Sequence, residues 1–173
     1  MSNRILSIKG IFLKDLDNII DLNKNQSIIY DKIPFIFESK DVDKWCKKCN
    51  LRCMNCTLTI DNTPYFIPSD IKTDKNNIVF TRSKEEGLYC SPFCAQRFIC
   101  DTYPKHLHLI KSENLVRLYN FIHSKNVIGI NPFYNRYMLE AYGGTMPESE
   151  FKLQLKNSKN LLIEKKKKKK TKR

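Results

Sequence analysis

The stretch GLYCSPFCAQRFIC, residues 87–100, holds three of the seven cysteines of this 173-residue chain. The other four lie upstream in WCKKCNLRCMNC, residues 45–56. Ser91 and Pro92 together predict the start of a helix, because a hydroxyl group can cap the first turn and proline suits the first helical position. We therefore expect a short helix from Pro92 that carries Cys94 in its first turn, with Cys90 directly before the cap.

The spacing of these cysteines is typical of a zinc site. Zinc prefers four ligands at tetrahedral corners, and a Cys-x-x-Cys turn supplies two of them. Cys90 and Cys94 supply two more, because positions four apart at a helix start lie on one face. The helix N-terminus also favours their thiolate forms. Spacing alone leaves two candidates for the upstream pair, either Cys46 and Cys49 or Cys53 and Cys56.

The expected location of the protein inside the cell also favours metal binding over disulfides. The N-terminus lacks the apolar core and cleavage site of a signal peptide, and no apolar run is long enough to span a membrane. We expect a cytosolic or nuclear protein with no membrane partner, where thiols stay reduced. An odd number of cysteines, seven, fits a disulfide framework poorly.

Positive charge is concentrated at the C-terminus. The chain carries 31 Lys and Arg against 18 Asp and Glu, a net charge of +13. Residues 151–173 account for +10 of this, so the rest of the chain is nearly neutral. We expect a disordered basic tail that binds nucleic-acid phosphates through counterion release; a solubilising tail and a nuclear import signal remain alternatives. The predicted contacts are Lys165, Lys166, Lys167, Lys168, Lys169 and Lys170.

The chain is predicted to be a small α+β protein in which zinc stabilises a four-cysteine finger with short strands and a helix. We expect an N-terminal helix and short strands in residues 1–40 and the finger region in residues 41–110. A helical part in residues 111–156 and the basic tail in residues 157–173 follow. Within the finger region, PYFIP (64–68) and NNIVFTR (76–82) read as strands, and SDIKTDKNN (69–77) between them reads as a polar loop.

Three further helices are predicted after the cysteines. Ser112 is the expected cap of the first of them. Asn131 and Pro132 open the second, over FYNRYMLEAY (133–142), whose aromatic side chains are expected in the core and which ends at Gly143 and Gly144. A capping box of Thr145 and Glu148 is expected to start the third, PESEFKLQL (147–155).

A family resemblance narrows the choice of ligands. CMNC, then PYFIP, a variable loop and GLYCSPFCA resemble the zinc finger named for its Phe-Cys-Ser sequence, with Tyr89 in place of the phenylalanine. The pattern is closer still to the poxvirus viral late transcription factor two family, which has relatives in African swine fever virus and giant DNA viruses. LEAYGGTMPESEF (139–151) resembles the Gly-Gly segment that follows the finger in the giant-virus relatives.

The resemblance implies one zinc ion held by Cys53, Cys56, Cys90 and Cys94. It also implies a late-gene transcription factor whose partners are the viral RNA polymerase, other transcription factors or nucleic acid. The expected location is the host cytoplasm, in viral factories, with the nucleus as an alternative. The competing hypothesis is a zinc-finger adaptor that binds host proteins of innate immune signalling.

Other readings of the site residues stay open. Cys46 and Cys49 are an alternative pair, or the start of a second metal site with Cys100 and a histidine from the strand-like HLH segment, His106 or His108. Cys100 alone reads as a small buried residue. A zinc closed by four cysteines is structural, and no catalytic motif is present, so no enzymatic activity is expected.

Two surface features distinguish the functional hypotheses. A basic stripe through Arg82, Arg97 and Lys105 would favour nucleic acid as the partner. An exposed apolar patch with an acidic rim would favour a protein partner.

Overall fold

The computed structural model describes residues 36–38, 45, 46, 49, 51–75, 77–83 and 86–164. The helix expected within residues 1–40 and residues 165–173 of the expected disordered tail lie outside these ranges. Residues 158–164 of that tail are ordered and form a 3-10 turn and a strand, which corrects the expected start of the disordered segment. Within the described residues the chain mixes helices with small antiparallel sheets, which confirms the α+β class. None of the helices in the described ranges is long and apolar enough to cross a membrane.

A three-stranded antiparallel sheet lies next to the cysteine region. It consists of β1 (Ile36–Glu38), β2 (Pro68–Asp74) and β3 (Asn77–Arg82) in the order β1-β3-β2. The prediction for β3 is confirmed, but β2 occupies the segment that was expected to be a loop. Most of its side chains are exposed, so it shows no apolar alternation and is held by backbone pairing to β3. In the expected strand PYFIP, Tyr65 forms an isolated bridge to Tyr89, and Pro68 is the first residue of β2.

Two helices follow this sheet in the sequence; the second packs against β2, and the first packs against the second. Helix α2 (Pro92–Thr102) begins where predicted, and the Ser91 hydroxyl accepts a hydrogen bond from the Cys94 amide. Helix α3 (Lys105–His123) begins seven residues before the predicted cap at Ser112. The Ser112 hydroxyl instead accepts a hydrogen bond from Gln96 Nε2 at 2.9 Å, which joins the two helices.

The earlier start of α3 changes the reading of two histidines. His106 and His108 lie in the first turn of a helix and not on a strand-like face. Positions two apart on a helix point in different directions, so the two imidazole rings do not form a ligand pair.

The C-terminal part departs most from the prediction. It comprises β4 (Val127–Ile130), the short 3-10 turns η2 (Arg136–Met138) and η3 (Glu140–Tyr142), α4 (Glu148–Lys156), η4 (Ser158–Leu161) and β5 (Leu162–Glu164). Strands β4 and β5 pair antiparallel. Helix α4 is confirmed, but it follows Pro147 without any side-chain cap, so the capping box of Thr145 and Glu148 is wrong.

The helix expected over residues 133–142 is replaced by η2 and η3. Leu139 separates them in an extended conformation, is 2% exposed and bridges to Met146. Two backbone hydrogen bonds accompany the bridge, from the Glu140 amide to the Met146 carbonyl (3.0 Å) and from the Met146 amide to the Met138 carbonyl (2.8 Å). This pairing between positions seven residues apart overrides the local helical pattern.

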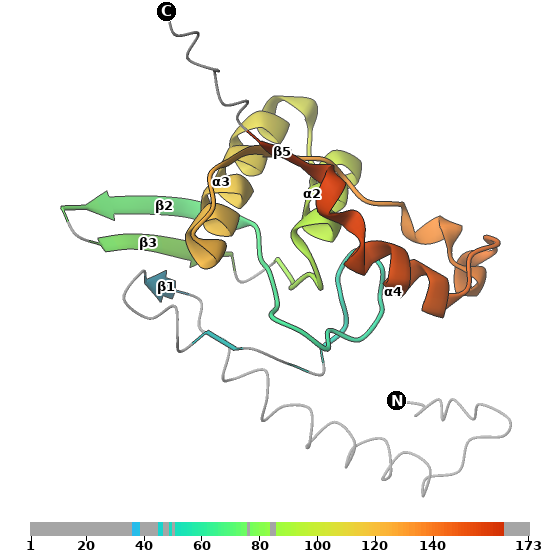
Figure 1. Cartoon of the computed structure of the whole chain (residues 1–173). Helices are drawn as coiled ribbons and strands as arrows, with labels where there is room; N and C mark the ends of the chain where they lie inside the picture. Colours follow the sequence, from blue (N-terminus) through green and yellow to red (C-terminus); the bar gives the residue numbers. More distant parts are fainter. Residues whose placement is uncertain are drawn as a thin grey trace, which may run out of the picture.

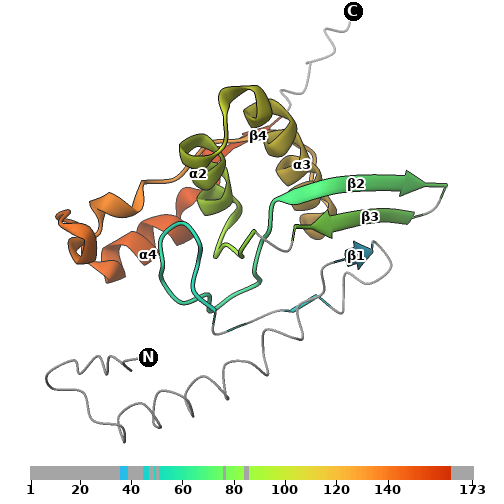
Figure 2. The ribbon, with the colours of Figure 1, turned by 180° about the vertical axis from the view of Figure 1, so that it is seen from behind.

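The arrangement places the cysteine loop in the middle of the molecule. Figures 1 and 2 show the β2–β3 hairpin projecting at one end and α4 at the other, with the teal loop of residues 51–66 between them. One contiguous core joins this loop to the helices, and five cysteines belong to it: Cys49, Cys53, Cys56, Cys90 and Cys94. Trp45 anchors the chain upstream: its indole nitrogen donates to the Pro64 carbonyl at 2.9 Å, and its ring lies 4.9 Å from that of Phe37.

Candidate metal centre

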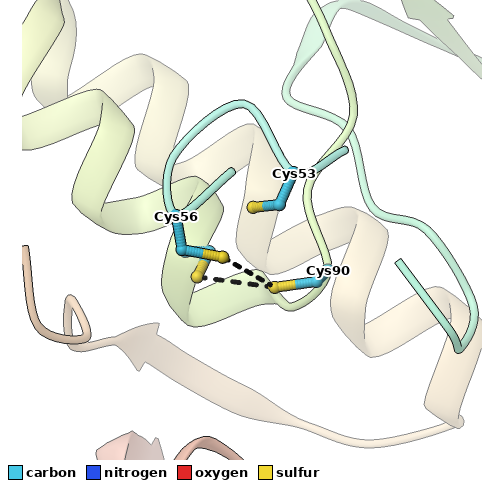
Figure 3. Close-up of side chains that lie close together, drawn as sticks. Cys53, Cys56 and Cys90 are labelled. Carbon is cyan, nitrogen blue, oxygen red and sulfur yellow. Dashed lines mark hydrogen bonds between the residues drawn. The ribbon is translucent and has the colours of Figure 1, made fainter. Parts of the chain in front are cut away.

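Four cysteine sulfurs converge in the core. The Sγ atoms of Cys53, Cys56, Cys90 and Cys94 all lie within 4.8 Å of one another, and all four residues are buried. Figure 3 shows Cys53 and Cys56 on one loop, with their sulfurs directed into the same space as the sulfur of Cys90, which lies on the segment that leads into α2. The structure therefore gathers the tetrad that the family resemblance implies, and these cysteines can hold a metal ion.

The upstream pair sits in a tight backbone turn. The Cys53 amide donates to the Leu58 carbonyl at 2.9 Å, and the Thr57 amide donates to the Cys53 carbonyl at 2.8 Å. Thr57 has a φ of 62°, which is uncommon for a β-branched residue and reflects how sharply the chain turns after Cys56. The turn brings both thiols to the same side.

Backbone pairing fixes this turn against the downstream pair. The Met54 amide donates to the Leu88 carbonyl at 2.9 Å. Tyr65 and Tyr89 exchange two backbone hydrogen bonds of 2.8 Å, so the residue before Cys90 is tied to the end of the loop. These contacts span the gap between the two cysteine pairs without requiring a metal ion.

The sulfur geometry fits a tetrahedral zinc ion. The Sγ of Cys90 lies 3.6 Å from the Sγ of Cys56 and 3.6 Å from that of Cys94. Four sulfurs at the usual zinc–sulfur distance would be separated from one another by about 3.8 Å. All seven cysteines are free thiols, so no disulfide competes for these sulfurs.

The thiols perturb one another's protonation. Burial raises the pKa of Cys53, but hydrogen bonds from Cys56, Cys90 and Cys94 outweigh burial and hold the pKa well below its usual range. Hydrogen bonding to Cys53 is the largest cause that raises the pKa of Cys90 and of Cys94. Several thiolates can coexist in so small a volume only beside a compensating cation, and a divalent metal ion provides it.

The cysteines outside the tetrad form no second cluster. Within the described part of the chain, no other three metal-ligating side chains come together, so the combination of Cys46 and Cys49 with Cys100 and a histidine is not assembled. Cys49 is buried, and burial raises the pKa of its thiol. Cys100 is exposed, contrary to the expectation of a buried residue. His108 Nε2 contacts the Tyr103 carbonyl at 2.7 Å.

Two contacts around the tetrad were not predicted from the sequence. The Tyr142 hydroxyl donates to Thr57 Oγ1 at 2.7 Å and connects the 3-10 turns to the cysteine loop. A Cβ atom at Gly87 would lie 3.1–3.2 Å from the Met54 side chain, so the cysteine loop passes close to the backbone at Gly87. The first contact joins residues 85 positions apart, and no local pattern signals such a pairing.

Comparison with known proteins places the chain in no established family: no protein-family model, curated protein or solved structure matches it.

Proposed function

We propose that the tetrad binds one zinc ion that has a structural role. The four sulfurs are buried and would close the coordination sphere, which leaves no open position for a substrate. Because the tetrad belongs to the main core, the zinc would connect the cysteine loop, α2 and the segment before it into one folded unit. The chemistry of this donor set, four buried thiols within 4.8 Å of one another, carries the proposal.

We further propose that the protein acts in late-gene transcription of a large DNA virus. The four ligands are those implied by the likeness to the viral late transcription factor two family, and the Tyr-Cys-Ser-x-x-Cys-Ala element lies at the start of α2, as the motif requires. In this proposal the zinc holds the fold, and contacts to nucleic acid or the transcription machinery are made by the surface and by the basic tail.

The basic stripe that would have favoured nucleic acid as the partner does not form on the surface. Arg82 is only 3% exposed and belongs to the interior. Arg97 is partly buried, donates to the Phe133 carbonyl at 2.7 Å and pairs with Asp101 at 3.3 Å. Lys105 is exposed, but the other two residues of the stripe are not exposed beside it. Nucleic-acid contacts by the described part of the chain must therefore use another surface.

A specific observation favours the alternative function of a protein adaptor. A groove of about 460 Å³ between α3 and the β4–β5 ribbon exposes Leu109, Ile128 and Ile163, with Glu113 on its lining. Leu109 is 71% exposed, which is unusual for a leucine on a packed helix. An apolar groove beside an acidic side chain is the surface that the adaptor hypothesis predicts.

Complementation of a depleted virus tests the proposed function. Cells would be infected with virus in which this gene is repressed, and would receive either the unaltered chain or a Cys53→Ser, Cys56→Ser variant. We expect late transcripts to be restored by the unaltered chain alone, with early transcripts equal in both. Late transcripts that are unaffected by repression, together with altered host signalling, would instead support the adaptor function.

A further inference from the structure

An aromatic and basic surface lies next to the cysteine loop. It consists of Arg52 from that loop and Arg136, Tyr137 and Tyr142 from the 3-10 turns, and we call it the tyrosine platform. Tyr137 is 61% exposed and Tyr142 is 38% exposed, although their spacing in the sequence had suggested core positions. Aromatic rings contribute most to stability when they are buried. Two such rings exposed side by side therefore indicate a binding role.

The platform is held in place by contacts among its own members. The two tyrosine rings meet edge to face with centroids 6.3 Å apart. The Arg136 guanidinium lies 5.4 Å from the Tyr137 ring centre and 5.8 Å from that of Tyr142. The hydrogen bond of Tyr142 to Thr57 Oγ1 attaches this group to the cysteine loop.

The two guanidinium groups of the platform, those of Arg52 and Arg136, have no ion pair with a carboxylate of the described residues. Arg52 donates to the Thr57 carbonyl at 3.1 Å, and Arg136 contacts the aromatic rings. Both charges are therefore available to an anionic ligand.

A small pocket with a free hydrogen-bond donor adjoins the platform. It has a volume of about 220 Å³ and is lined by Arg136, Tyr137, Met54, Asn55 and Asp101, among others; the Asp101 carboxylate is engaged by neighbouring side chains. Asn55 is 6% exposed, and its Nδ2 has no hydrogen-bond partner among the described residues. That nitrogen has almost no exposed surface of its own, so the pocket wall would have to shift before an acceptor atom of a ligand could reach it.

We propose that the tyrosine platform binds single-stranded nucleic acid. Bases would stack on the exposed faces of Tyr137 and Tyr142, and Arg52 and Arg136 would contact the phosphates. The pocket is smaller than the usual site for a drug-sized molecule and suits a single base.

The composition of the platform distinguishes this partner from others. A duplex hides the faces of its bases and would leave the tyrosine rings unused. A protein partner is better served by the aliphatic groove at α3, which lacks exposed aromatic rings. The inference rests on the proposed function because it names the class of partner that the finger region would contact during transcription.

Binding of a fluorescent single strand to the full zinc-loaded chain tests the inference. Strands of about twelve nucleotides with 2-aminopurine at one position would be used, as DNA in one series and RNA in the other. Salt of about 0.3 M would weaken the contribution of the lysine tail. We expect Tyr137→Leu combined with Tyr142→Leu to lower the affinity roughly tenfold or more and to remove the quenching of 2-aminopurine by stacking.

A matched control is available in the same segment. Tyr134 is 44% exposed but packs against Phe133, away from the platform, so Tyr134→Leu should leave affinity and quenching unchanged. Tyr142→Phe keeps the ring and should retain binding. Zinc content and circular dichroism verify that each variant is folded; if the double variant unfolds, Arg136→Gln replaces it, with a smaller loss of affinity expected.

The outcomes separate this inference from the proposed function. Stronger binding of RNA than of DNA would identify RNA as the single strand that the platform binds, and the reverse would identify DNA. A folded platform variant that binds like the unaltered chain would overturn the inference, as would an equal loss in Tyr134→Leu. In either case the complementation result for late transcripts would stand by itself.

Discussion

Replacement of Cys90 by serine is expected to abolish stoichiometric zinc binding and to unfold the region around the tetrad. Cys90 Sγ lies 3.6 Å from two other tetrad sulfurs, so its removal leaves three ligands and a hydroxyl group in a buried site. Zinc binding by fingers of this kind contributes on the order of 10 kcal/mol, which is comparable to the whole stability of a small domain. Circular dichroism and thermal melting, with and without added zinc, measure the loss.

The matched control is Cys100→Ser. Cys100 lies on the same helix as Cys94, but it is exposed and outside the tetrad. We expect this variant to bind one zinc ion and to melt like the unaltered chain. If Cys90→Ser in the presence of a chelator had the same helicity and melting temperature as the unaltered, zinc-loaded chain, zinc would have no structural role.

A second large effect is expected from Gly144→Ala. A Cβ atom at this position would lie 2.2 Å from the Met138 carbonyl oxygen and 2.5 Å from that of Tyr137. Both are backbone atoms, so η2 must move to make room, and overpacking of this kind costs about 3 kcal/mol. For a chain of this size we expect the melting temperature of the zinc-loaded protein to fall by roughly 10 °C.

The neighbouring glycine provides the comparison. Gly143 has a φ of +84°, but a Cβ atom there would meet nothing within 4 Å. Gly143→Ala therefore introduces only backbone strain, about 1 kcal/mol, and a correspondingly smaller fall in melting temperature. Equal effects of the two substitutions would show that the close approach at Gly144 does not constrain the turn.

The elements predicted correctly are those with local signals. Ser91 and Pro92 determine the start of α2 through one hydroxyl group and one fixed backbone angle, and both act within a single turn. The four-residue spacing of Cys90 and Cys94 likewise places both thiols on one side of that turn. The choice of Cys53 and Cys56 required the family resemblance, because Cys46 and Cys49 have the same spacing.

The elements that were missed depend on pairing with a neighbouring segment and not on their own residue pattern. Strand β2 is polar and mostly exposed, and only its pairing with β3 makes it a strand. The helix expected after Pro132 is interrupted because Leu139 is drawn into the core and pairs with Met146. The tyrosine platform follows from this interruption, since η2 and η3 leave Tyr137 and Tyr142 on the surface.

Native mass spectrometry of the full chain, purified without chelator, tests the central claim most directly because it counts metal ions per molecule. We predict one zinc ion in the unaltered protein, one when Cys46 and Cys49 are both replaced by serine, and none when Cys53 and Cys56 are replaced. Loss of the metal ion from the Cys46 and Cys49 variant, with retention in the Cys53 and Cys56 variant, would contradict the assignment.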